Sequence, residues 1–384
     1  MRRGIARATA SGGDRCGSAL IAVLVALVVA MLTATAAAML ARAQQDDARG
    51  AAAALRARTA AEGALATVLA AWPASWSASL APGASDTRTI TSAAGTATVR
   101  ALRLDGGRFL LSAEASSGAL AGPVGDAVRR VGLFAQFENV RYDGAAALVA
   151  AGPFDLTTDT EVRALDAAPP GWSDCTSPPE SPVAAAAAAP TVRANGGAGL
   201  LGAVLSAPAA WVPPSPERFG DVERDALAAR ADVVVSAGGV VSPAPRATGG
   251  AGASCVRDAT SWGEPYRGAG AVGPCTSDYP VIHLRGPGVT TLRGPARLQG
   301  TLIVDGSLNV VGRVEIAGLA VVGGTVQASS GALVVDGGLL VRGTSVSLGP
   351  GSRVRRSRCA LDRAAAGASR AVPLARRAWV DIVR

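Results

Sequence analysis

The chain has few side chains that could carry out chemistry. Its only histidine is His283, and it contains no lysine, so arginine supplies all the other basic residues. A lysine nucleophile and a P-loop lysine are therefore excluded, and histidine-dependent triads or zinc sites have almost nothing to draw on. The remaining candidates are the acids Asp305, Glu315 and Asp336. Gathered on one face, they could bind a metal or serve acid and base catalysis.

These acids lie in a segment with a glycine repeat. Glycine recurs every six residues, with one extra residue after the seventh glycine. The glycines are Gly288, Gly294, Gly300, Gly306, Gly312, Gly318, Gly324, Gly331, Gly337, Gly343 and Gly349. The second and fourth residues after most of them are apolar, such as Leu302 and Val304, and alternate strand residues share one face. The repeat predicts a parallel β-helix over residues 281–352, with about 18 residues per coil.

A coil of this length places Gly323, and not a second acid, above Asp305. The three acids are therefore expected to be turn and surface residues. We predict that the chain is not an enzyme and binds no cofactor or metal, with a carbohydrate-active β-helix enzyme as the remote alternative. The periodicity resembles that of a bactofilin-type β-helix in a shorter form.

An apolar stretch without charged residues runs from Gly17 to Ala41. A helix of this length spans a bilayer, and the arginine-rich segment before it is expected to stay in the cytoplasm. The bulk of the chain would then be exported. The alternative is a signal peptide cut before Gln44, because Ala41-Arg42-Ala43 offers a small-x-small cleavage site.

Helix-favouring residues continue beyond the apolar stretch. They run to Trp72, just before Pro73, which predicts one helix over residues 18–72. The outer part of this helix is only partly amphipathic. Three leucines fall near one face of it, namely Leu55, Leu65 and Leu69, but Arg58 and Glu62 interrupt that face.

A short basic leader ending in Gly17, followed by an apolar helix that becomes more polar, resembles the N-terminus of type IV pilin-like proteins. The PilX-type pilus assembly proteins are most similar, followed by the GspK-type minor pseudopilins of type II secretion. The run Ala61-Glu62-Gly63-Ala64-Leu65 is similar to the Ala-Glu-x-Ala-Leu segment of the PilX-type group. The resemblance implies that prepilin peptidase cleaves between Gly17 and Ser18.

The same resemblance implies a structural role. The chain would be a minor component of a type IV pilus or pseudopilus, anchored in the bacterial inner membrane by one helix and packed against other pilin-like subunits through it. The rival interpretation is a membrane-tethered β-helix scaffold or adhesin that enters no filament. After a cytoplasmic leader over residues 1–17, the fold class is therefore predicted as α+β: a long transmembrane helix, a small antiparallel β region and a C-terminal parallel β-helix.

Three further regions are predicted from composition and pattern. Alternating runs around Asp105-Gly106-Gly107 predict a β-hairpin, within a small pilin-like domain over residues 73–145. Residues 146–280 are rich in Pro, Ala and Gly, and are expected to be irregular. Residues 353–384 are expected to cap the end of the β-helix. Their arginine cluster lacks interleaved aromatic residues, so nucleic acid is not expected as a partner.

Four cysteines follow the apolar helix without C-x-x-C spacing: Cys175, Cys255, Cys275 and Cys359. In an exported chain they suggest two disulfides. Cys255 with Cys275 is the favoured pair because these residues would close a compact loop, which leaves Cys175 with Cys359. Free buried thiols are the alternative.

Overall fold

The computed structural model describes residues 15–92, 95–117, 127–142, 146–175, 184–188, 192–194, 198–201, 204–206, 218–250, 252–374 and 378–381. The chain divides into two compact units. The first comprises Met1–Ala135 with Pro373–Arg384, and the second comprises Gln136–Val372. The chain therefore leaves the first unit to build the second and then returns to it.

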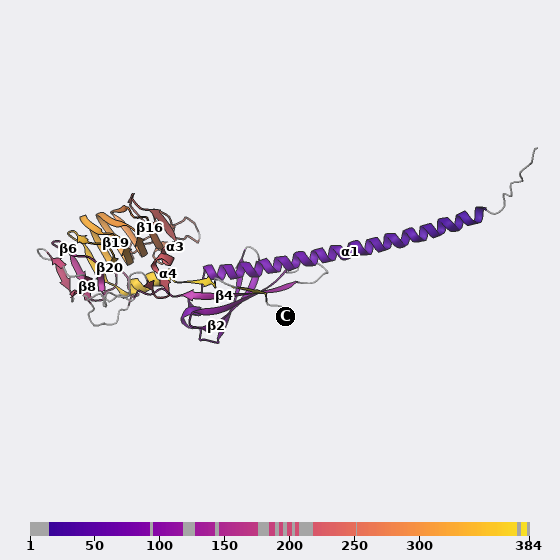
Figure 1. Ribbon diagram of the computed structural model, residues 1–384, viewed down its shortest axis with the longest axis horizontal. Coiled ribbons are helices and arrows are strands. Elements are labelled where there is room, and N and C mark those ends of the chain that lie inside the picture. The colour runs from indigo at the N-terminus through magenta and orange to yellow at the C-terminus, as the bar shows by residue number, and fades with distance from the viewer. Residues whose placement is uncertain are drawn as a thin grey trace, which may run out of the picture. The chain divides into compact units, whose positions relative to one another are not determined.

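The first unit is organised around α1 (Arg15–Ala70), a single helix of 56 residues (Figure 1). Between Leu20 and Leu40 its large apolar side chains are exposed, with exposed fractions of 49–71%. By length and composition this helix can cross a membrane, because about 20 apolar residues span the hydrocarbon core of a bilayer. An apolar helix at this place suggests a membrane anchor or a signal sequence.

A short helix and an antiparallel sheet follow α1 in the first unit. The elements are α2 (Ala74–Ala78), β1 (Ser85–Ser92), β2 (Gly95–Asp105), β3 (Arg108–Ser116), β4 (Val128–Glu138) and β24 (Trp379–Asp381). The first four strands lie in chain order, and β24 pairs with β4. The predicted hairpin is confirmed, since Asp105 pairs with Arg108 across Gly106-Gly107.

The second half of α1 packs on β1, β2 and β3 through small side chains. The buried residues along it are Ala53, Ala57, Ala60, Ala61, Ala64, Leu65 and Val68. Of the leucines that fall near one face of the helix, Leu65 is fully buried but Leu55 is 65% exposed. Alanine forms the contact because it lets the helix approach the sheet closely. A Cβ added to Gly95 would lie 3.2 Å from the Cβ of Ala60.

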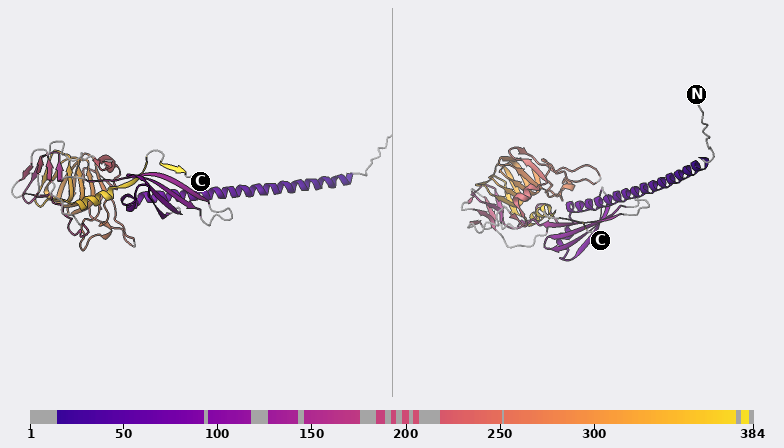
Figure 2. Two further views of the ribbon diagram at one scale, coloured as in Figure 1. Left: turned by 90° about the horizontal axis from the view of Figure 1, so that it is seen from below. Right: turned by 45° about the vertical axis from the view of Figure 1, so that its right-hand side comes forward.

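The second unit is built on a parallel β-solenoid, whose strands lie side by side in each view (Figures 1 and 2). Its strands are β5 (Ala146–Ala150), β6 (Phe154–Leu156), β7 (Glu161–Arg163), β8 (Ala184–Ala188), β9 (Val192–Ala194), β10 (Gly199–Leu201), β11 (Val204–Ser206), β14 (Val233–Ser236), β15 (Val240–Val241), β16 (Val281–Arg285), β17 (Val289–Arg293), β18 (Ala296–Val304), β19 (Ser307–Val322), β20 (Val326–Val341), β21 (Val346–Leu348) and β22 (Arg353–Arg356).

These strands form parallel stacks on the faces of the solenoid. The first stack runs β14, β16, β18, β19, β20, β5, β8 and β11. The second runs β15, β17, β19, β20, β21, β6 and β9. The third runs β18, β19, β20, β22, β7 and β10. The long strands turn corners and so contribute to more than one stack.

The glycine repeat forms the solenoid that it predicted. Thr301 pairs with Leu319, an offset of 18 residues, and Leu319 pairs with Gly338, an offset of 19. The extra residue in the repeat appears as a register shift between Asn309 and Val311. The apolar residues of each hexad fill one continuous core: Leu302, Val304, Leu308, Val310, Val314, Ile316, Leu333, Val335 and Leu339 are each at most 2% exposed.

The solenoid is not continuous in sequence. Strands β5, β6 and β7 stack in parallel on β20, β21 and β22, the last coil of the glycine repeat, and β8 to β10 stack on them in turn. The coils of β5 to β10 therefore precede the glycine repeat in the sequence, although they stack on its last coil. Residues 146–280 were expected to be irregular, but their described part supplies strands at both ends of the stack: β5 to β11 extend it beyond β20 to β22, and β14 and β15 pair with β16 and β17 at the other end.

Two helices cover the outer face of the first stack. They are α3 (Arg224–Ala229), which follows β12 (Arg218–Phe219) and β13 (Val222–Glu223), and α4 (Arg358–Ala368), which precedes β23 (Arg370–Pro373). Leu227 of α3 and Leu361 of α4 join Ile303, Leu319 and Val321 in one buried cluster. The C-terminal segment was expected to cap the end of the solenoid. Instead, α4 lies along the flank, packed on β18, β19 and β20.

Candidate functional site: a polar cavity on the solenoid

The processing residues that the sequence suggested lie near the start of α1. Gly17 and Ser18 are the third and fourth residues of this helix as described, and residues 1–14 lie outside the described part of the chain. Cleavage between Gly17 and Ser18 stays a prediction.

Glu62 lies on the packed half of α1 and pairs with Arg58, one turn earlier, at 2.8 Å. Both side chains are more than a third exposed, so this pair adds only a few tenths of a kcal/mol to helix stability, about 0.3–0.5. Together with Val131 and Trp379 they line a hollow of about 300 Å³ in the first unit. Trp379 is 51% exposed. The hollow joins the predicted helix motif to an exposed aromatic side chain of β24.

Both predicted disulfides are present. Cys175 bonds to Cys359 and Cys255 bonds to Cys275, with Cα–Cα distances of 5.8 Å and 4.7 Å. The prediction that favoured these pairs over the other two pairings is therefore confirmed. Disulfides form and persist in oxidising compartments, so they point towards an exported chain.

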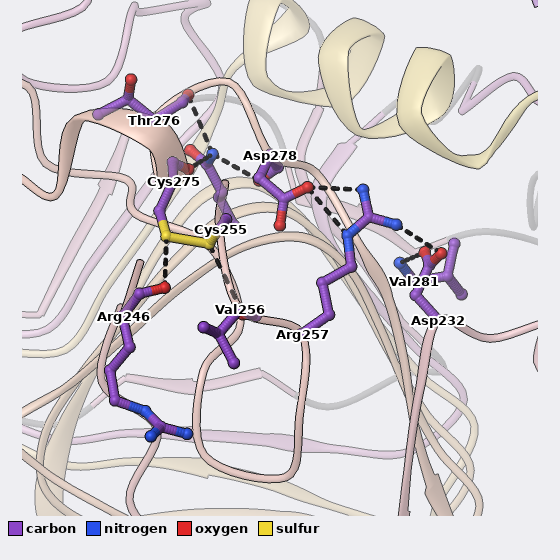
Figure 3. Close-up of polar contacts among 10 residues, drawn as sticks. Asp232, Arg246, Cys255, Val256, Arg257, Cys275, Thr276, Asp278 and Val281 are labelled. Carbon is purple, nitrogen blue, oxygen red and sulfur yellow. Dashed lines mark hydrogen bonds and ion pairs between the residues drawn. A yellow bond between two sulfur atoms is a disulfide. The ribbon is translucent and has the colours of Figure 1, made fainter. Parts of the chain in front are cut away.

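The Cys255–Cys275 bond secures the segment between β15 and β16 (Figure 3). Beside it, Arg257 bridges Asp232, at 2.7 Å, and Asp278, at 2.6 Å. Burial disfavours the charged guanidinium, but the two carboxylates outweigh it and raise the pKa of Arg257. The side chain of Trp262, fully buried, enters the solenoid core from this segment. The segment therefore covers the coil of β16 and β17.

The three acids considered for catalysis do not converge. Glu315 pairs with Arg313 at 2.6 Å, and Asp336 pairs with Arg355 at 2.6 Å. Asp305 lies beneath Gly323, as the coil length predicted: a Cβ on Gly323 would meet the carbonyl oxygen of Asp305 at 2.3 Å. Among the described residues, no group of three or more His, Cys, Asp or Glu side chains could hold a metal ion.

Asp305 instead belongs to a cluster that links three segments of the second unit. Nε2 of His283 lies 2.9 Å from Oδ2 of Asp305, and Arg224 donates to Oδ1 at 2.8 Å. The backbone N–H of Gly286 donates to Oδ2 at 3.0 Å, and Arg224 also pairs with Asp225 at 3.0 Å. An ionised carboxylate only accepts hydrogen bonds, so Nε2 of His283 donates to Asp305.

The cluster keeps Asp305 ionised. Burial raises the pKa of a carboxyl group, but the hydrogen bonds from His283 and Gly286 act in the opposite direction. The charges of His283 and Arg224 add to them, and the pKa of Asp305 is held below its ordinary value. Because His283 and Arg224 are only 8% and 9% exposed, their geometry is fixed by the surrounding packing.

This cluster borders a cavity of about 470 Å³ beside α3. The lining residues are Asp225, Ala228, Ala229, Val234, His283, Arg285 and Asp305. Strand register explains how they meet: Val234 pairs with His283, and His283 pairs with Ile303, two residues before Asp305. The cavity therefore spans three neighbouring strands of the first stack and one helix.

The sequence assigned no role to His283 and did not reveal this cavity. The signal that was available is the alternation of the strand: Ile282 and Leu284 enter the core, so His283 and Arg285 must face outwards. The hydrogen bond of Arg224 to Asp305 could not be read from the sequence, because 81 residues separate the two.

Comparison with protein-family models, with curated proteins and with solved structures finds no match for this chain. The likenesses to PilX-type proteins and to bactofilins therefore remain likenesses of sequence pattern.

Proposed function

We propose that this chain is a structural, pilin-like subunit of the PilX type that joins a type IV pilus or a secretion pseudopilus. In this proposal, α1 anchors the chain in the bacterial inner membrane, with its N-terminus in the cytoplasm and its bulk periplasmic or extracellular. Prepilin peptidase removes residues 1–17. The partners are membrane lipid and the helices of other pilin-like subunits.

The division of α1 into two different halves supports this proposal most directly. The first half exposes large apolar side chains from Leu20 to Leu40, whereas the second half buries a row of alanines on an antiparallel sheet. A simple anchor needs only the first property. A helix that is shared between a bilayer and a packed domain, and that can transfer from the bilayer into a bundle of similar helices, needs both.

The exposed half of α1 also offers small residues for helix packing. It contains threonine and alanine between Thr33 and Ala38, and the hydroxyls of Thr33 and Thr35 donate to carbonyls of their own helix. Such residues leave no unsatisfied polar group in lipid and let neighbouring helices approach closely. This surface suits assembly with other membrane helices.

The test is the mature N-terminus of the native chain. We expect mass spectrometry of chain purified from membranes to find Ser18 as the first residue, and the Gly17→Val variant to keep its leader. Gly13→Val, a matched change within the leader, should be processed normally. We also expect the wild-type chain, and not Gly17→Val, in filaments sheared from cells. A native chain that begins at Met1 would refute the processing step.

A second candidate is a membrane-tethered scaffold or adhesin that enters no filament. The β-solenoid favours this candidate. Its coils are held together within one chain by a disulfide and by strand pairing, so the unit needs no other subunit for its stability. An intact leader together with absence from sheared filaments would support this candidate. A chain that begins at Gln44 and occurs free of membranes would instead indicate secretion after signal-peptide cleavage.

A further inference from the structure

We propose that the cavity beside α3 is a binding site for a uronic acid unit, a sugar ring that carries one carboxylate. The site consists of Arg285, His283, Asp225 and the small apolar side chains of α3 and β14 that line the cavity. This inference goes beyond the proposed filament role and does not depend on it, because the site lies wholly within the solenoid unit.

Arg285 supplies the charge for the ligand. It lies at the end of β16, its side chain is exposed, and it lines the cavity. Within the described part of the chain its guanidinium has no ion pair or hydrogen bond. Arg224, by contrast, is already held by Asp225 and Asp305. A free guanidinium beside a cavity is suited to bind a carboxylate in the bidentate manner.

The acids of the cavity restrict what that ligand can be. Asp225 is largely exposed, with 90% of its side chain accessible, and Asp305 is ionised. Two carboxylates repel a phosphate dianion, but they accept hydrogen bonds from hydroxyl groups. The polar groups therefore fit a ligand with a single negative charge and several hydroxyl donors.

The size and the apolar wall of the cavity agree with a sugar ring. A volume of about 470 Å³ lies within the range of small-ligand sites. Ala228, Ala229 and Val234 provide an apolar surface for the C–H groups of a ring, and Val234 is 54% exposed. An uncharged sugar would use this wall and the acids but would leave Arg285 without a partner.

The test is titration of the full-length chain in detergent with D-glucuronate, D-glucose or inorganic phosphate. Ligand-observed NMR measures the binding of each compound. We expect glucuronate to bind with a Kd on the order of 1 mM. Glucose and phosphate should bind at least about tenfold more weakly, because each lacks one of the two features that the site recognises. Equal binding of glucose and glucuronate, or tighter binding of phosphate, would overturn the proposal.

Variants assign the binding to this cavity. Arg285→Gln should weaken glucuronate binding about ten- to hundredfold, which is the usual worth of a charge-assisted hydrogen bond. Arg293→Gln, a change of another exposed arginine at the end of a solenoid strand, is the matched control and should bind as wild type does. Both variants should melt at the wild-type temperature, since Arg285 is exposed. If Arg285→Gln is folded and still binds glucuronate with wild-type affinity, the site is not this one.

Discussion

Cys175 and Cys359 are bonded to each other although 184 residues separate them in the chain. Cys175 follows the coil of β5, β6 and β7, and Cys359 lies in the first turn of α4. Nearby, the ring of Trp172 packs under two guanidinium groups, those of Arg267 at 4.4 Å and Arg363 at 4.9 Å. The coil of β5, β6 and β7, which comes first in the chain, is thus linked covalently to α4, which follows the final solenoid strand β22.

This bond should stabilise the second unit more than the other disulfide does. In the chain-entropy model, closing a loop of 184 residues contributes about 5 kcal/mol and closing one of 20 residues contributes about 3 kcal/mol. We expect Cys175→Ala with Cys359→Ala to lower the free energy of unfolding more than Cys255→Ala with Cys275→Ala does. Denaturant titration measures both. In hydrogen exchange, only the first pair should loosen β5 to β7; equal losses in the two variants would contradict the argument.

The glycines at the corners of the solenoid should tolerate no side chain. Gly318 has φ of +130°, and a Cβ there would lie 2.1 Å from the carbonyl oxygen of Gly300 in the neighbouring coil. Gly318→Ala should therefore cost about 3 kcal/mol of stability. Gly239→Ala is the control, because nothing lies within 4 Å of its added Cβ, and it should change stability by less than about 0.5 kcal/mol. A wild-type melting temperature for Gly318→Ala would show that the coils can separate easily.

The alanine row of α1 should be equally sensitive to size. Ala57 is fully buried against the sheet, whereas Ala52, on the same helix, is exposed. Ala57→Leu should destabilise the first unit by about 1–3 kcal/mol through overpacking, and Ala52→Leu should be neutral. Hydrogen exchange of peptides from β2 and β3, measured by mass spectrometry, reports on this unit directly. If both variants exchange like wild type, α1 does not depend on close approach.

Local patterns made much of the fold predictable. The glycine hexads predicted the solenoid and its coil length, because each hexad contains one glycine for a corner and, in most hexads, two apolar residues for the core. Asp105-Gly106-Gly107 predicted the hairpin, since the turn and both strands lie within a few residues of one another. The disulfide pairing also followed from the spacing of Cys255 and Cys275, which left one pair.

The parts that the sequence did not reveal depend on distant contacts. Strands β5 to β11 are short and lack the hexad glycines, so they carry no periodic signal. β5 to β7 become ordered by pairing with β20, β21 and β22, and β8 to β10 by pairing with β5 to β7 in turn. The contact face of α1 does not follow its leucines, since Leu55 is exposed and small alanines are buried, because side-chain size decides what fits against the sheet. The cluster around Asp305 needs Arg224, which arrives from a helix laid down 81 residues earlier.

The ionised Asp305 predicts how the second unit responds to acid. Its pKa is depressed in the folded chain, below the value of about 3.9 that it takes when unfolded. Such a carboxyl contributes stability that is fully present above the unfolded pKa and is lost as pH falls through the folded pKa. The wild-type free energy of unfolding should therefore fall as pH is lowered from 5 through about 4 and below. Denaturant titration at each pH measures it.

Two variants separate Asp305 from the other acids in this experiment. Asp305→Asn removes the titrating group, so its free energy of unfolding should be lower at neutral pH but should fall less steeply in acid. Arg224→Gln keeps the carboxyl and removes one of the charges that lower its pKa, so the acid-induced loss should begin at higher pH. If Asp305→Asn falls as steeply as wild type below pH of about 4, another carboxyl governs the acid response.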